Sequence, residues 1–282
     1  MEVYEFYPEN HKYKTQSGKT GISASGIVEH VSNEYDSKYW TQWKAWERLL
    51  CKGNKAQMKR QFRRIRAEKL DKSYKIGDYA IFDALQRAFP NKSIGNLDEI
   101  IKQEWKKKNL KSQIVGSAYH DAKEKESIDR SYEINPWTGE KYDVIISYKW
   151  EKGVKISTVD LLNLKKGYYP ELIVYYDGIF GQIDRVWVDE NRRFWIRDFK
   201  TNEEIKTENQ FQKLKYPVAH LDDCNYNHYR IQLGTYAWIL TSLDYKCQKL
   251  ALDHFNKEYQ FDYLAQDVEA IILDYKINNL AF

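Results

Sequence analysis

The sequence predicts an α/β (α+β) protein in which helices pack on a mixed β-sheet. In the first third, apolar residues recur at three- and four-residue steps, which is typical of helices. After residue 130 the pattern changes to short β-like runs separated by turn signals. The 282 residues, 42% hydrophobic and 30% charged, suit a globular protein of one large domain or two small ones.

The N-terminal part is expected to be helical. Helices are predicted over residues 38–70, 79–89 and 100–108. Three tryptophans share one face of the first helix, which favours packing into a core: Trp40, Trp43 and Trp46. We therefore expect residues 1–113 to be a basic helical elaboration. It would belong to the same compact unit as a core over residues 114–282.

From residue 116 the expected core order is helix, three strands, helix, strand, with a short strand and helix inserted after the first helix. Helices are predicted over residues 116–130, 158–166, 229–243 and 267–275. Strands are predicted over residues 142–150, 171–176, 179–188, 194–200 and 247–255. Asp177-Gly178 is a strong hairpin signal between two of these strands. The polar stretch 201–227 is long enough for a functional loop.

The charge is distributed unevenly along the chain. The 45 Lys and Arg against 41 Asp and Glu give a net charge of only +4. Residues 38–75, however, hold 13 basic and 3 acidic side chains, which favours a polyanionic partner. A solvated helix surface is the alternative. The basic residues assigned to nucleic acid are Lys59, Arg60, Arg63, Arg64 and Arg66.

The number of cysteines and the length of the apolar runs indicate the cellular compartment in which the protein is expected. Three scattered cysteines are too few for a disulfide framework or a Cys-rich zinc site, so a reducing compartment is expected. No 18-residue apolar run occurs, and the first residues lack the apolar segment of a secretory signal. We expect a cytoplasmic protein with no membrane partner.

Two carboxylates and a lysine form the main chemical pattern. Asp184 lies inside one predicted strand, and Asp198 lies near the end of the next, with the turn at Asp189-Glu190-Asn191 between them. Antiparallel pairing can bring the two carboxylates together, and Lys200 points to the same sheet face as Asp198. Such a cluster is costly to bury unless a hard cation joins it. Mg²⁺ held by carboxylates and substrate phosphates would give a site for phosphodiester hydrolysis.

The motifs in this order resemble the PD-(D/E)XK nuclease superfamily, and most closely its RecB-like branch, which includes phage exonucleases. The resemblance covers roughly residues 114–256. It rests on five motifs: Gly116-Ser117-Ala118-Tyr119-His120, Pro170-Glu171, Gly181-Gln182-Ile183-Asp184, Asp198-Phe199-Lys200-Thr201 and Gln232-Leu233-Gly234-Thr235-Tyr236. It implies a restriction-endonuclease-like core.

The resemblance also implies roles for single residues. Asp184 and Asp198 would be the main ligands of Mg²⁺ or Mn²⁺, joined by His120 and the main-chain carbonyl of Phe199. Glu171 is a weaker candidate ligand, because in some relatives this glutamate is only structural. Lys200 would be the catalytic lysine. Gln232 and Tyr236 would orient the lysine, the nucleophile or the DNA backbone.

Two features of the sequence differ from those of some members of this branch. Some members of this branch hold an iron–sulfur cluster on four cysteines, and three cysteines cannot supply that ligand set. A Gly-x-x-x-x-Gly-Lys-Ser/Thr loop is also lacking, so a helicase motor is not expected on this chain.

Each site residue also has a plainer interpretation. Asp184 and Asp198 could be surface residues paired with Arg185 or Arg197. Lys200 could be solvated, and His120 could be an ordinary polar helix residue. Gln232 and Tyr236 could serve packing. A second metal at His220 and Cys224 is disfavoured, because no further ligand pair stands at metal-site spacing.

The sequence therefore favours a metal-dependent deoxyribonuclease, with an exonuclease of replication, recombination or repair preferred over an endonuclease. DNA is the expected partner, together with a helicase or recombination protein in some forms of the hypothesis. The alternatives are a catalytically silent DNA-binding module, a partner-dependent subunit of a nuclease–helicase complex, and an RNA nuclease.

Overall fold

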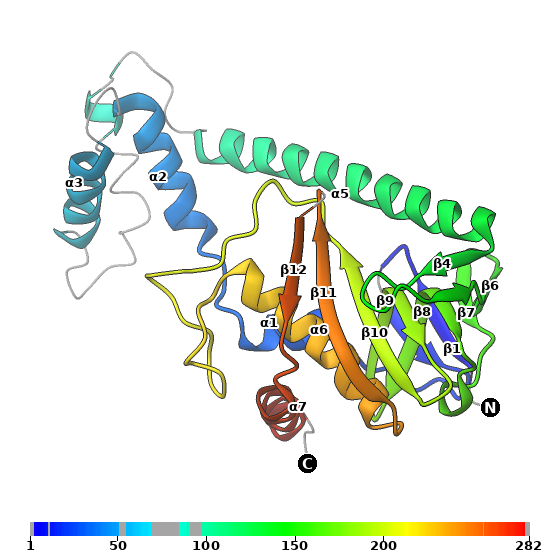
Figure 1. Cartoon of the computed structure of the whole chain (residues 1–282). Coiled ribbons are helices and arrows are strands. Elements are labelled where there is room, and N and C mark those ends of the chain that lie inside the picture. Colours follow the sequence, from blue (N-terminus) through cyan, green and yellow to red (C-terminus); the bar gives the residue numbers. More distant parts are fainter. Residues whose placement is uncertain are drawn as a thin grey trace. The chain divides into compact units, whose positions relative to one another are not determined.

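The structure is a computed structural model, and it describes residues 3–10, 12–50, 55–68, 85–88, 90, 97–255 and 257–279. The chain divides into two compact units (Figure 1). The first joins Met1–Asn33 to Val115–Phe282, and the second is Glu34–Ile114. Each unit is described by itself.

A mixed β-sheet forms the centre of the first unit. Its strand order is β12-β11-β10-β9-β3, with β8 paired to β9. The bounds are β3 (Ile22–Ser23), β8 (Gly167–Tyr176), β9 (Ile179–Val188), β10 (Arg193–Phe199), β11 (Lys246–His254) and β12 (Lys257–Phe261). Strands β8, β9 and β10 are antiparallel, whereas β10 and β11 are parallel. The mixed α+β fold class is thereby confirmed.

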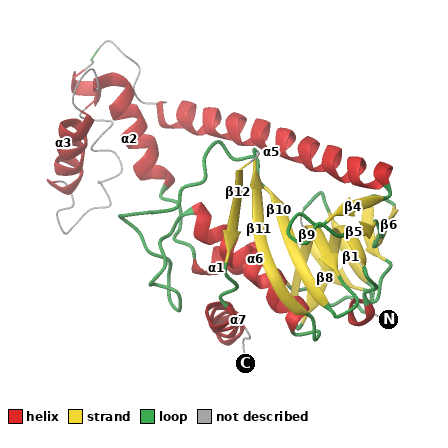
Figure 2. Cartoon of the chain, in the orientation of Figure 1, coloured by secondary structure: helices red, strands yellow, loops and turns green. Residues whose placement is uncertain are grey.

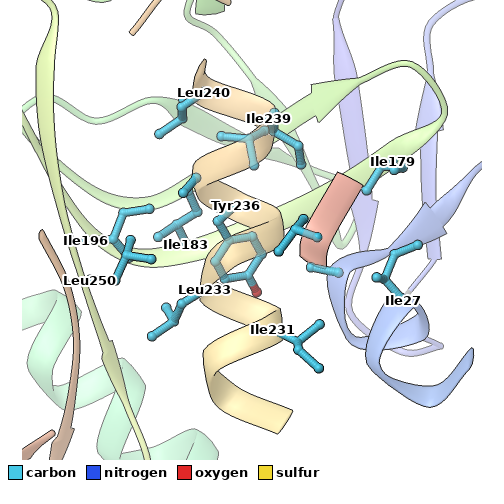
Figure 3. Close-up of a cluster of buried hydrophobic side chains, with 14 of the residues drawn as sticks. Ile27, Ile179, Ile183, Ile196, Ile231, Leu233, Tyr236, Ile239, Leu240 and Leu250 are labelled. Carbon is cyan, nitrogen blue, oxygen red and sulfur yellow. The ribbon is translucent and has the colours of Figure 1, made fainter. Parts of the chain in front are cut away.

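The parallel pair β10–β11 requires a crossover connection, and helix α6 supplies it. The helices of this unit are α1 (Ala24–Val31), α6 (Asn225–Thr241) and α7 (Ala265–Asn279), together with the second part of α5 (Leu97–Arg130). Helix α6 packs against β8 to β11 and against α1 and α7. Figure 3 shows its apolar side chains, among them Leu233 and Tyr236, facing Ile183 and Ile196 of the sheet. The strands on either side of α6 are thus held by one buried core.

The N-terminal prediction is wrong for residues 3–10 and 12–31. They form strands and helix α1 that belong to the first unit rather than to a helical elaboration. Strand β3 pairs in parallel with β9, and the Ser23 side chain caps α1 by accepting from Gly26 N. Short strands rich in tyrosine alternate too briefly to stand out in the sequence, and distant parts of the chain supply their pairing partners.

A second sheet flanks the first, with strand order β2-β1-β7-β6 (Figure 2). It comprises β1 (Tyr4–Tyr7), β2 (Lys12–Thr15), β6 (Tyr148–Glu151) and β7 (Val154–Ser157). The strand predicted over residues 142–150 is therefore divided. Its first part, β5 (Lys141–Asp143), pairs with β4 (Tyr132–Ile134), and its last part becomes β6 of the other sheet. The helix predicted over residues 158–166 is reduced to the 3₁₀ turn η1 (Leu161–Asn163).

The second unit contains α2 (Ser37–Leu50), α3 (Lys55–Glu68) and the first part of α5. Trp43 and Trp46 are buried with Phe62, so their assignment to packing is confirmed, whereas Trp40 is partly exposed. Residues 79–84 and 89 of the predicted helix 79–89 lie outside the described residues, and residues 85–88 are helical. The helices predicted over 100–108 and 116–130 form one helix, because nothing between them breaks it. None of the described helices is long and apolar enough to cross a membrane.

Candidate metal centre

A polar cleft of about 470 Å³ opens in the first unit. Strands β8, β9 and β10 form its floor, while α5, α6 and the second sheet (β2-β1-β7-β6, called the N-terminal sheet below) contribute to its walls. The predicted site residues that line it are His120, Glu171, Asp184, Asp198, Lys200, Gln232 and Tyr236. The fold therefore brings seven residues from five motifs into one cleft.

Asp184 and Asp198 occupy neighbouring positions on antiparallel strands. The paired part of β9 and β10 ends with Arg185 opposite Arg197. Asp184 and Asp198 are the next residue on each strand beyond this pair, so their side chains lie on the other sheet face. In the described residues, His120, Glu171 and Asp184 form a group whose potential ligand atoms lie within 4.8 Å of one another. A helix and two strands thus converge on one point.

Asp184 is held by two donors. Its Oδ2 accepts the backbone N–H of Phe199 at 2.8 Å and lies 3.3 Å from His120 Nδ1. Burial acts to raise the pKa of Asp184, but His120, the Lys200 charge and the Phe199 N–H together outweigh it and leave that pKa lowered. Burial likewise acts to lower the pKa of His120, yet Asp184 and the nearby carboxylates raise it to about 9. In the absence of a cation the two side chains therefore form an ion pair.

Asp198 and Lys200 form a second, more deeply buried pair. The Lys200 ammonium lies against Asp198 Oδ2, and the Asp198 side chain is only 3% exposed. Burial and the charge of Asp184 raise the pKa of Asp198 to about 6. Burial opposes the charge on Lys200, but Asp198 and Asp184 keep the pKa of Lys200 above its usual value. The centroid of the Tyr229 ring lies 5.2 Å from Lys200 Nζ, within the range of a cation–π contact.

Glu171, the weaker candidate ligand in the sequence analysis, belongs to the group of potential ligands with His120 and Asp184. Its backbone has a φ of 54° within strand β8, in the left-handed region that side chains other than glycine disfavour. Its carboxylate accepts from Gln182 Nε2 and from Lys155 Nζ, the latter at 3.3 Å. Burial and the charge of Asp184 raise the pKa of Glu171 to about 7. Such local strain is typical of functional positions.

Gln232 and Tyr236 form a linked pair on α6. Gln232 Nε2 donates to the Tyr236 hydroxyl at 3.0 Å, as their four-residue spacing allows. The Tyr236 ring packs over Gly181, where an added Cβ would lie 2.4 Å from Tyr236 Cε1. Gly181 therefore provides the space that lets the tyrosine reach the floor of the cleft. The pair serves both packing and the lining of the site.

The plainer interpretation of the two aspartates is wrong. Arg185 pairs with Glu133 at 3.2 Å rather than with Asp184. Arg197 pairs with Asp253 and Glu258 at 3.2 and 3.4 Å rather than with Asp198. The arginines point to the opposite sheet face, and the aspartates point into the cleft.

The rejected second metal site is an ordinary loop. His220 pairs with Asp267, and Cys224 occupies the N-cap position of α6. Asp223 accepts from Asn33 and contacts His228. These partners account for the polar groups of the loop without a cation.

The basic residues predicted to meet nucleic acid belong to α3 of the second unit, whereas the cleft is lined by residues of the first. Arg60, Arg63 and Arg64 are exposed, and Lys59 is partly buried with its ammonium over the Trp43 ring at 5.9 Å. The side chain of Arg66 lies outside the described residues.

Several cleft residues were not found from the sequence. Glu124 stands four residues after His120 on the same helix face, and that spacing could have identified it. Gln182 lies inside a recognised motif. Lys155 and Trp150 have no local signal, because only the docking of the β6–β7 hairpin brings them to the cleft.

The residues present fit a hard divalent cation. The buried Gln182 Oε1 makes no hydrogen bond within the described residues. The buried Asp198 Oδ2 is in contact with the Lys200 ammonium. Asp121, Glu124, Glu171, Asp184 and Asp198 contribute five carboxyl groups to a cleft that also holds two lysines. Oxygen donors of this kind suit Mg²⁺ and Mn²⁺, and the histidine favours Mn²⁺ of the two.

No protein-family model matches the chain, and no curated protein sequence matches it. A similar solved structure is that of the protein SSO0001, which is 12% identical. The similarity covers 80% of this chain and 87% of that one, with a TM-score of 0.28. A likeness at this level supports no statement about fold family or function.

Proposed function

We propose that this chain is a metal-dependent deoxyribonuclease with a PD-(D/E)XK-type core. One observation supports the proposal most directly. His120, Glu171 and Asp184 converge within 4.8 Å of one another, beside the buried pair of Asp198 and Lys200. A set of carboxylates with one buried ammonium suits the hydrolysis of a phosphodiester better than it suits passive binding of an anion.

Asp184, Asp198, Glu171 and His120 would hold the cation. When bound, Mg²⁺ or Mn²⁺ would neutralise phosphate charge and make a bound water a stronger nucleophile. In the absence of a cation, the excess of carboxylates in the cleft repels a DNA phosphate. The same residues therefore make DNA binding in the cleft depend on the cation.

Lys200 would stabilise charge rather than remove a proton. Its pKa is held above the usual value for lysine, so the ammonium stays protonated at neutral pH. Hydrolysis adds a water oxygen to phosphorus and breaks one phosphorus–oxygen ester bond, and negative charge builds up on the phosphoryl oxygens. A buried ammonium beside those oxygens lowers the energy of that state.

Gln232 and Tyr236 would position the substrate. Their mutual hydrogen bond and the packing of Tyr236 over Gly181 hold both polar groups at the cleft wall. Groups locked in this way can orient a phosphate or the attacking water at little entropic cost.

The direct test is cleavage of end-labelled linear and closed circular DNA with Mg²⁺ or Mn²⁺. Asp198→Asn is expected to abolish cleavage while the fold is retained. Asp253→Asn is the matched control, because it removes a carboxylate from the next strand of the same sheet, where Asp253 pairs with Arg197 instead of lining the cleft.

Loss of linear DNA alone would indicate an exonuclease, whereas loss of the circle as well would indicate an endonuclease. If wild-type protein cleaves neither DNA with either metal, or if Asp198→Asn cleaves normally, the proposal fails in this form. Intact DNA binding without cleavage would then favour a silent or partner-dependent subunit.

A further inference from the structure

Trp150 is an unusual residue at the mouth of the cleft. It is 55% exposed, more than any other of the nine tryptophans, all of which lie in the described residues. It belongs to β6, the edge strand of the N-terminal sheet, and lines the same cleft as the candidate metal ligands. A large apolar ring is thus left in water beside a polar site.

The ring is tied to the candidate metal centre through one lysine. Trp150 and Lys155 face each other across the β6–β7 pair, and Lys155 Nζ lies 5.4 Å from the Trp150 ring. The same ammonium lies 4.4 Å from the Tyr148 ring and 3.3 Å from Glu171. Since the Lys155 side chain is only 8% exposed, this geometry is well restrained.

The sheet that carries Trp150 is basic. Residues 4–19 and 148–157 hold six lysines and three glutamates. Lys149 pairs with Glu151 and Lys155 pairs with Glu171, which leaves four lysines of the sheet (Lys12, Lys14, Lys19 and Lys152) against Glu5 and Glu9. An exposed aromatic ring among lysines is the combination that binds unpaired nucleotides, because the bases stack and the phosphates meet positive charge.

The cleft is of a size that suits single nucleotides. About 470 Å³ lies in the lower part of the roughly 300–1,000 Å³ of small-ligand clefts. We propose that an unpaired nucleotide next to the scissile phosphate stacks on Trp150, which makes single-stranded DNA or a frayed end the substrate of this cleft. The inference rests on the proposed function.

The test measures binding without cleavage. Fluorescence anisotropy of a labelled oligo(dT) strand is followed with Mg²⁺ in the cleavage-deficient Asp198→Asn background, beside a duplex of the same length. Trp150→Ala is expected to bind the single strand about tenfold more weakly than the protein with Trp150, because one stacking contact is lost. Its binding to the duplex is expected to be unchanged. Trp150→Phe is expected to retain most of the affinity.

Tyr132→Ala is the matched control. Tyr132 also lies under a lysine, with Lys141 Nζ 4.0 Å from its ring, but it does not line the cleft. Its affinity for the single strand is expected to equal that of wild type. Equal binding by Trp150→Ala and wild type, or an equal loss in Tyr132→Ala, would overturn the inference.

Three further results distinguish the stacking site from the proposed nuclease activity and from a second protein copy that covers the Trp150 ring. If wild type cleaves DNA but Trp150→Ala binds normally, stacking is refuted and the nuclease stands. If the single strand binds through Trp150 but nothing is cleaved, the nuclease fails and the stacking site remains. A wild-type dimer that Trp150→Ala dissociates would show that a second copy covers the ring, which also overturns the inference.

Discussion

Gly181→Ala is expected to displace Tyr236 and thereby impair the cleft without touching a charged residue. The added Cβ would lie 2.4 Å from Tyr236 Cε1, whereas ordinary contact begins near 3.4 Å. The ring must therefore move by about 1 Å. Tyr236 is 4% exposed and lies between the sheet and α6, so this movement disturbs packed neighbours (Figure 3).

The expected size of the effect follows from two opposing contributions. Overpacking a core costs about 1–3 kcal/mol. Replacing glycine by alanine returns about 0.4–1 kcal/mol through the unfolded chain. The difference of the central values is a net loss of about 1.3 kcal/mol, which corresponds to a Tm lower by about 3–5 °C for a unit of this size. A displacement of about 1 Å at a catalytic wall lowers turnover by about a hundredfold.

The assay combines thermal unfolding with DNA cleavage and uses a double-mutant cycle. In a Tyr236→Ala background the ring is gone, and Gly181→Ala is expected to add no further loss of stability. Gly116→Ala is the matched control, since its Cβ would meet only the Thr201 hydroxyl at 3.2 Å and a helical alanine is favourable. Gly181→Ala with unchanged Tm and turnover, or a penalty that persists without the ring, would refute the reasoning.

Three other predictions concern charge. Lys200→Met should lower turnover about 10²–10³-fold with little change in DNA affinity, and a pure loss of affinity would contradict its role. His120 has a folded pKa of about 9 against 6.5 when unfolded, so its pairing with Asp184 stabilises the protein fully below pH 6.5 and is lost as the pH rises through 9. In EDTA, urea unfolding should therefore show a larger penalty for His120→Asn at pH 6 than at pH 10, and equal penalties would argue against the ion pair. Arg63→Glu with Arg64→Glu should reduce the slope of log affinity against log salt by about 2, and an unchanged slope would make α3 an ordinary surface.

The sequence by itself determined the elements whose signals are local. The turn signal at Asp189-Glu190-Asn191 and the period-two alternation of the two flanking strands specify the β9–β10 hairpin, so the meeting of Asp184 and Asp198 followed from spacing alone. The placement of Lys200 on the Asp198 face and of Gln232 beside Tyr236 followed from strand and helix periods in the same way. The mixed α+β class followed from the change of period after residue 130.

Only the tertiary structure decided what depends on contacts between distant segments. The N-terminal strands pair with β7 and β9, more than a hundred residues away, and no local pattern announces such partners. Glu171 turns into the cleft through an unfavourable φ, which no propensity predicts. Lys155 and Trp150 reach the centre because their hairpin packs beside β1. The physical reason is the same throughout: backbone periodicity directs a side chain to one face, but burial against a distant segment decides what that face meets.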